Sequence, residues 1–128
     1  MENDDITLLD ANVLLRYFLR DDEKLYEEAY RIIDEKSCFV LTNILQEVLY
    51  VLCGPVYQLP RKDVADAVVQ SFSDINYMDR ETVECALRLF VEKPKMDFPD
   101  CMLLAYHVLY DVDVSTFDQK LKKKLKES

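Results

Sequence analysis

The feature of this sequence that most restricts its fold is a series of short apolar runs separated by longer stretches of helical periodicity. The runs cover Ile6–Leu9, Cys38–Leu41, a weaker Ile75–Met78, and Asp113–Thr116 with Val112 before it. They lack the clean alternation of a half-exposed strand, which is typical of strands buried on both faces. Helices between such strands predict an α/β fold in which helices cover both sides of a central parallel sheet.

The stretches between and after these runs are expected to be helices. They are Ala11–Leu19, Glu23–Glu35, Asn43–Cys53, Arg61–Phe72, Arg80–Val91, Asp97–Tyr110 and Asp118–Lys126. Gly54, which with Pro55 ends the third of them, is the only glycine in the chain. Glycine-rich phosphate-binding loops are therefore absent, which excludes P-loop and dinucleotide-binding fingerprints.

Length and composition indicate one soluble domain over residues 1–128. The chain has 128 residues, half of them apolar and about a third charged. No apolar run approaches the roughly 20 residues of a membrane span, and the acidic first residues do not resemble a secretory signal. We expect no membrane partner and a cytoplasmic location.

The cysteines and the single histidine do not form a recognisable site. Cys38, Cys53, Cys85 and Cys101 each lie in an apolar stretch without CxxC spacing, so we interpret them as small buried side chains in a reducing compartment. His107 is the only histidine and is expected in the core, and a zinc site is not indicated.

The net charge of −9 argues against broad, non-specific binding of nucleic acid, which normally needs a basic surface. It does not exclude a nucleic-acid substrate, because a group of carboxylates that binds Mg²⁺ is acidic until the metal arrives.

Two acids follow the first two apolar runs, and each has a simpler alternative role. Asp10 directly follows the first strand, where it is equally suited to cap the next helix. Glu47 lies opposite a helical stripe that begins with Leu45 and Val48. An exposed helix face explains Glu47 as well as a site does.

Two further acids lie in the last third of the chain. With Asp97 as the N-cap, Asp100 is the third residue of an apolar helix and interacts favourably with its dipole. Asp118 follows the last expected strand, where a capping box begun by Ser115 is the simpler explanation. The lysines Lys120, Lys122, Lys123, Lys124 and Lys126 then either compensate the helix dipole or bind RNA.

Taken together, the four acids predict a metal site. Ligands in parallel α/β folds bind at the carboxyl ends of the strands, where these acids can converge. Carboxylates that repel one another favour a bound cation, and oxygen ligands without histidine or cysteine select Mg²⁺ or Mn²⁺. Such an ion activates water and stabilises charge on a phosphodiester.

At these residues the sequence resembles the PIN-domain family, especially the toxin branch of bacterial VapBC toxin–antitoxin systems. The matching stretches, in the family's order, are Leu8–Tyr17 (LLDANVLLRY), Thr42–Glu47 (TNILQE), Asp97–Ala105 (DFPDCMLLA) and Ser115–Asp118 (STFD).

The resemblance implies a three-layer α/β/α sandwich, Mg²⁺- or Mn²⁺-dependent cleavage of an RNA substrate, a homodimer and an antitoxin protein that blocks the site. It assigns the catalytic, metal-binding positions to Asp10, Glu47, Asp100 and Asp118. It assigns supporting roles to Asn12 and Thr116, and Asp97 is either a fifth acid or only a helix cap.

The sequence departs from the family in two places. Cys101 and Met102 follow the third acid where many relatives have small residues, and Asp111–Asp113 replaces a glycine that is common before the last strand. These changes concern packing and turns rather than metal chemistry.

Two alternatives give different functions. A PIN fold that binds RNA or protein without cleaving it would need no complete acid set. A phospho-acceptor receiver domain would need an aspartate near the middle of the chain, and Tyr50–Leu59 contains none.

Overall fold

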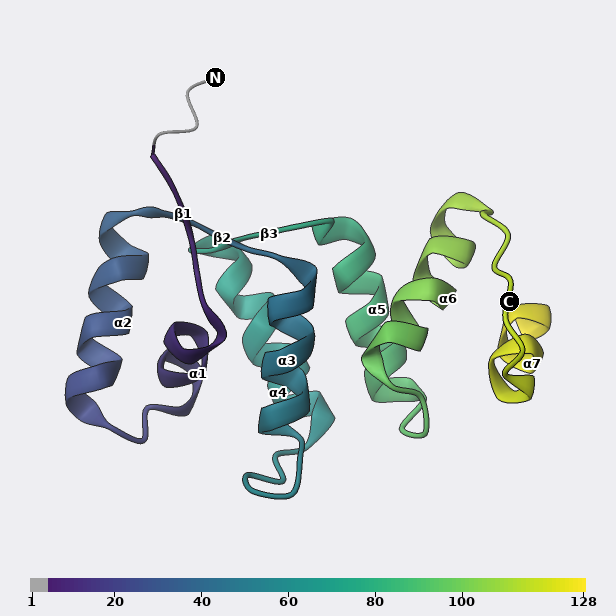
Figure 1. Ribbon diagram of the computed structural model, residues 1–128, viewed down its shortest axis with the longest axis horizontal. Coiled ribbons are helices and arrows are strands. Elements are labelled where there is room, and N and C mark those ends of the chain that lie inside the picture. Colours follow the sequence, from purple (N-terminus) through teal and green to yellow (C-terminus); the bar gives the residue numbers. More distant parts are fainter. Residues whose placement is uncertain (1–4) are drawn as a thin grey trace. The chain divides into compact units, whose positions relative to one another are not determined.

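The structure, a computed structural model, describes residues 5–128, and these residues form two units. Unit 1 ends at Met78, and unit 2 comprises Asp79–Ser128 (Figure 1). None of the helices within residues 5–128 is both long and apolar enough to cross a membrane.

Unit 1 is built on a parallel three-stranded sheet in the order β1-β2-β3. The strands are β1 (Ile6–Leu8), β2 (Ser37–Val40) and β3 (Asn76–Tyr77). Leu8 pairs with Phe39, and Phe39 pairs with Asn76 on its other side. The predicted α/β class, with a parallel sheet flanked by helices, is confirmed.

The helices of unit 1 are α1 (Ala11–Leu19), α2 (Glu23–Glu35), α3 (Thr42–Leu52) and α4 (Arg61–Gln70), followed by a short 3₁₀ turn, Ser71–Ser73. Its core contains Leu14, Val40, Leu45, Leu49 and Val68, all almost completely buried. The apolar stripe predicted for α3 is therefore confirmed.

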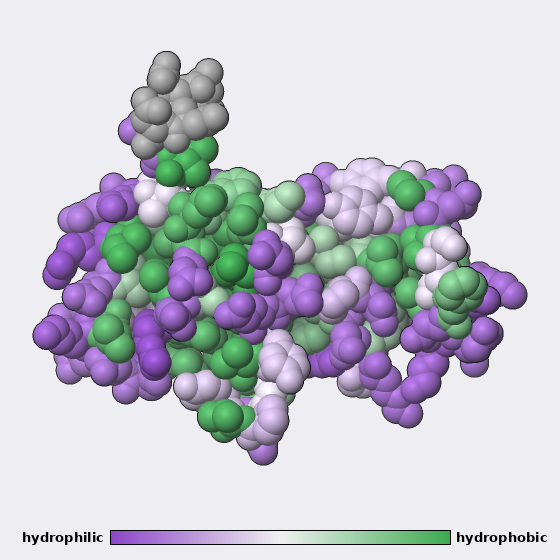
Figure 2. Space-filling view, viewed as in Figure 1, coloured by the Kyte–Doolittle hydropathy of each residue, from purple (hydrophilic) through white to green (hydrophobic). Residues whose placement is uncertain are grey.

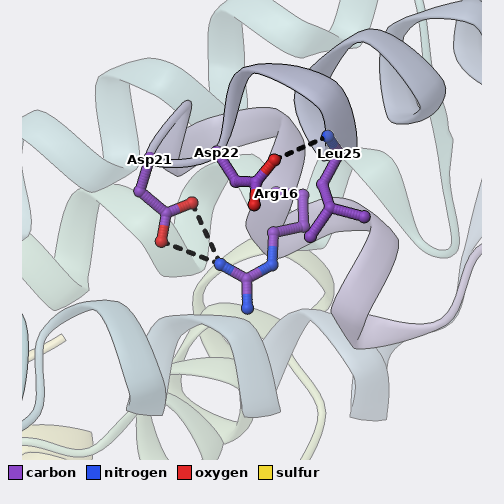
Figure 3. A network of polar contacts seen from close by, with 4 residues as sticks. All are labelled: Arg16, Asp21, Asp22 and Leu25. Atoms are coloured by element: carbon purple, nitrogen blue, oxygen red, sulfur yellow. Dashed lines mark hydrogen bonds and ion pairs between the residues drawn. The ribbon is translucent and has the colours of Figure 1, made fainter.

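A polar network fixes the turn between α1 and α2 (Figure 3). Arg16 Nη1 donates to both carboxylate oxygens of Asp21 at 3.0 and 2.8 Å, and the Asp22 carboxylate accepts from the Leu25 N–H at 3.0 Å. Asp22 is the N-cap of α2, so this network sets where the second helix begins.

The expectation that every strand is buried on both faces is wrong for β1. Cys38 and Val40 of β2 are buried, whereas Leu8 of β1 is 59% exposed. The cause is position, because β2 lies between two strands and β1 pairs only with β2 among the described residues. Figure 2 shows apolar surface, in green, between hydrophilic patches on the visible face.

Unit 2 is helical and consists of α5 (Arg80–Glu92), α6 (Phe98–Tyr110) and α7 (Gln119–Glu127). Helix α5 buries Val83, Ala86, Leu87 and Phe90, whose helical spacing places them on one face. The rings of Phe90 and Phe98 meet edge to face with their centroids 6.0 Å apart. This contact joins α5 to the first turn of α6 and so helps to position Asp97 and Asp100.

The strand predicted at Asp113–Thr116 is wrong, because residues 111–118 have no regular secondary structure. A strand must pair its backbone N–H and C=O groups with a neighbour, and unit 2 contains no other strand among its described residues. Asp111 ends α6 in the left-handed conformation, with φ of 55°, and the chain then runs to α7 as a loop.

Candidate functional site

Asp10 caps helix α1 at the carboxyl end of β1. Its carboxylate accepts a hydrogen bond from the Ala11 N–H at 2.8 Å, and the carboxyl group is exposed to solvent. The capping alternative for this residue is therefore confirmed. A cap that accepts one hydrogen bond still has oxygen lone pairs available for a cation.

Glu47 lies on the exposed face of α3, the helix that follows the adjacent strand β2. It is five residues beyond Thr42, or roughly 7.5 Å along the helix. The Thr42 hydroxyl oxygen is buried without a hydrogen-bond partner among residues 5–128. Asp10 and Glu47 thus follow neighbouring parallel strands of unit 1.

Asn12, predicted to support the acids, is exposed in the first turn of α1. It lines a groove of about 400 Å³ together with Arg16, Leu25 and Glu28, and neither Asp10 nor Glu47 lines that groove. The structure therefore places Asn12 beside α2.

In unit 2 the structure brings three of the predicted acids together. Asp97 is the N-cap of α6, although its side chain makes no capping hydrogen bond, and Asp100 is in the first turn. Burial raises the pKa of the Asp100 carboxyl, and the negative charges of Asp118 and then Asp97 raise it further. An elevated pKa of this origin is expected for carboxylates that share a site.

Asp118 is itself the N-cap of α7, which corrects the prediction that Ser115 has this role. Its carboxylate oxygen Oδ1 accepts hydrogen bonds from the Lys120 and Leu121 N–H groups at 2.8 and 3.1 Å. The Asp118 N–H donates to the Thr116 hydroxyl at 3.0 Å. Thr116, which the sequence predicts to support the acids, therefore contacts the backbone of one of them, Asp118.

Asp100 and Asp118 line a pocket of about 450 Å³ in unit 2. The other acidic and apolar residues that line it are Glu92, Pro94, Met96 and Leu121. The pocket lies between the end of α5, the turn before α6 and the beginning of α7. Its volume is in the usual range for small-molecule sites, about 300–1,000 Å³.

Five lysines line the same pocket: Lys93, Lys95, Lys120, Lys123 and Lys124. We call this site, with the residues of the preceding paragraph, the lysine pocket. The lysines of α7 were singled out from the sequence, but Lys93 and Lys95 were not. The sequence feature that could have indicated them is the Lys93-Pro94-Lys95 turn just before Asp97.

A model of the PIN domain family matches residues 7–126, which is nearly the whole chain and includes both units. The chain belongs to the PIN domain family. PIN domains are generally nucleases, so this PIN-domain protein has a nuclease-type fold. No significant match to it was found among curated proteins or among solved structures.

The acids of this PIN-domain protein have the chemistry that a divalent cation requires. They offer carboxylate oxygens alone, which are the donors that Mg²⁺ and Mn²⁺ prefer. Within residues 5–128, no three carboxylate, histidine or cysteine groups are arranged to hold a metal ion. In unit 2, Asp97, Asp100 and Asp118 interact through their charges. The donor set therefore fits the metal in chemical type.

The prediction that His107 lies in the core of the PIN-domain protein is wrong. His107 is partly exposed in the last turn of α6, and its Nδ1 lies 2.9 Å from the Val112 carbonyl oxygen. A carbonyl oxygen only accepts, so Nδ1 is the donor. The ring pairs with the backbone of the loop that follows α6.

The four cysteines are free thiols. The prediction of burial is confirmed for Cys38, Cys85 and Cys101, while Cys53 is half-buried. Burial raises the pKa of the Cys38 and Cys53 thiols, which keeps them in the less reactive protonated form.

Proposed function

We propose that this PIN-domain protein is a Mg²⁺- or Mn²⁺-dependent ribonuclease. The observation that carries the proposal is that Asp100 and Asp118 line one pocket, where burial and the charges of Asp118 and Asp97 raise the pKa of the Asp100 carboxyl. A partly buried carboxyl whose pKa is raised by neighbouring negative charges, in a nuclease-type fold, is suited to bind a cation.

In this proposal Asp10, Glu47, Asp100 and Asp118 would hold the cation, and residues 1–128 would act as one nuclease domain. When bound, the cation supplies neutralisation of phosphate charge and activation of water. The residues of the chain position it. Asp10 and Asp118 are fixed as helix caps, with capping hydrogen bonds of 2.8 Å to Ala11 and Lys120.

Three further residues, Thr116, Asp97 and Asn12, would support the four acids. The Thr116 hydroxyl accepts from the Asp118 N–H, which orients the loop that presents Asp118. Asp97 adds negative charge beside Asp100. Asn12 directly follows Ala11, whose N–H donates to the Asp10 carboxylate, and we propose that it supports Asp10.

The finer biological assignment is also a proposal. The resemblance to the toxin branch of VapBC systems suggests a homodimer in the cytoplasm, inhibited by an antitoxin protein. Four free cysteines agree with a reducing compartment. The gene next to this one tests the toxin assignment, because a toxin of this kind is expected beside a small gene for a DNA-binding antitoxin.

A PIN fold that binds RNA or protein without cleaving it is the second candidate. It is favoured by one observation, the absence within residues 5–128 of three metal-binding groups arranged around one point.

Incubation of the purified chain with total cellular RNA separates the two candidates, because the mixture includes structured and single-stranded RNAs. The ribonuclease proposal predicts new RNA ends with Mg²⁺ or Mn²⁺ and none in EDTA. Cleavage that persists in EDTA would contradict metal dependence. Intact RNA with both metals would favour the binding module.

A further inference from the structure

The lysine pocket is the most unusual charged feature of unit 2. Five lysines and three carboxylates line it, so cations outnumber anions there in a chain whose net charge is −9. The excess of positive charge is therefore local, and it lies beside Asp100 and Asp118.

Helix-dipole compensation does not explain all of these lysines. Lys124 and Lys126 are in the last turn of α7, where cations are favourable. Lys120 is the second residue of the same helix, where the dipole is positive and a cation is unfavourable. A lysine at that position needs another reason, and a negatively charged ligand in the pocket supplies one.

The lysines of α7 also divide by helix face. Lys120, Lys123 and Lys124 have the i, i+3, i+4 spacing of one face, and all three line the pocket. Lys122 and Lys126 are four residues apart on a different face, and neither lines the pocket. Lys122 and Lys126 can therefore serve as control positions on the same helix for substitutions of the pocket lysines.

We propose that the lysine pocket binds a nucleotide of the RNA strand next to the acids. The ammonium groups contact phosphate oxygens, and the apolar surface formed by Pro94, Met96 and Leu121 contacts the sugar or base. This inference deepens the proposed ribonuclease function and rests on it for the choice of RNA as the ligand.

The lining favours a nucleotide over an acidic protein segment. Met96 and Leu121 are almost completely buried and Pro94 is exposed, and these three residues form the apolar part of a pocket whose other lining residues are charged. A nucleotide combines a phosphate with a flat, partly apolar base, and so matches both kinds of surface. An Asp- or Glu-rich peptide would use the lysines but leave the apolar surface unmatched.

The test is binding of a fluorescein-labelled oligouridylate by the full chain in EDTA, measured by fluorescence anisotropy over a range of salt concentrations. Lys120→Gln with Lys123→Gln is expected to weaken binding about tenfold. It should also reduce the slope of log K against log salt by about 1.4, because each lost contact with single-stranded RNA removes about 0.7. Circular dichroism checks that α7 is retained.

Lys122→Gln with Lys126→Gln is the matched control, since it removes the same charge from the same helix. The control should keep the wild-type affinity and slope. Equal losses in the two double variants would overturn the proposal in favour of a general charge effect. Binding of a labelled oligoglutamate as tightly as the RNA, with the same dependence on Lys120 and Lys123, would overturn it in favour of an acidic protein partner.

The metal-free condition separates this inference from the proposed activity. RNA binding in EDTA does not require cleavage, so a chain without nuclease activity can still show that the lysine pocket binds RNA. If the chain cleaves RNA but the two double variants bind RNA equally well, the nuclease function stands and the proposed role of the pocket in RNA binding is wrong.

Discussion

The carboxylates of Asp100 and Asp118 line the same pocket, although one is in the first turn of α6 and the other caps α7. Burial raises the pKa of the Asp100 carboxyl, and the charge of Asp118 is the next largest cause. The two acids therefore repel each other in the metal-free protein, and a cation between them would relieve the repulsion.

The raised pKa predicts a pH dependence of stability. From the ordinary value of 3.8 up to the raised pKa, the folded chain holds a proton on Asp100 that the unfolded chain has lost. The free energy of unfolding therefore falls as pH rises through this window. Asp100→Asn removes this contribution, so its stability relative to wild type should rise over the same window, measured by urea unfolding at a series of pH values.

Asp63→Asn is the control for this measurement, because Asp63 is also the third residue of a helix, α4, and is exposed. Its stability relative to wild type should change less between pH 4 and 7 than that of Asp100→Asn. Parallel pH profiles for wild type and Asp100→Asn would contradict the account of Asp100.

Asp118 has a structural and a proposed chemical role, and two substitutions separate them. Asp118→Ala removes the acceptor for the Lys120 and Leu121 N–H groups and should cost about 1 kcal/mol of stability. Asp118→Asn keeps an acceptor and removes the charge, so its stability should stay close to that of wild type. Urea unfolding of both variants checks the difference, and equal losses would show that charge rather than capping stabilises α7.

Asp111 occupies a backbone conformation that suits glycine. Its φ of 55° is left-handed, and such a conformation costs a residue with a Cβ roughly 1 kcal/mol. Asp111→Gly should therefore raise the free energy of unfolding by up to about 1 kcal/mol, while Asp111→Val should lower it. Thermal unfolding measures both, and a destabilised glycine variant would show that the Asp111 side chain contributes more than its backbone costs.

Metal binding should stabilise the folded chain by mass action. With Mn²⁺ at about 100 times its dissociation constant, the gain is about 2.7 kcal/mol, or roughly 5–10 °C in melting temperature. The variant Asp10→Asn with Asp100→Asn should lose this gain and, without metal, be at least as stable as wild type. An unchanged response to Mn²⁺ in this variant would place the metal site elsewhere.

Local sequence patterns predicted most of the helices and strands, but not which acids lie close together or which segments pair with one another. Three parallel strands followed from short apolar runs, and the apolar faces of α3 and α5 followed from helical periodicity, because burial selects apolar residues at those positions. The strand at Asp113–Thr116 did not form, because a strand depends on a partner that its own sequence does not specify.

The candidate site was predictable only in part, for similar reasons. Asp97, Asp100 and Asp118 were all singled out, and the structure couples their charges. Lys93 and Lys95 were missed because a turn between helices has no period, so only folding brings it beside the lysines of α7.

The most direct test of the account measures RNA cleavage in Mn²⁺ by variants from both units. Asp10→Asn in unit 1 and Asp100→Asn in unit 2 keep side chains of nearly the same shape and remove one charge each. Each substitution is expected to lower the cleavage rate on the order of 100-fold or more, while Asp63→Asn should cleave like wild type. Wild-type cleavage by either Asp10→Asn or Asp100→Asn would contradict the claim that acids of both units serve one metal-dependent nuclease site.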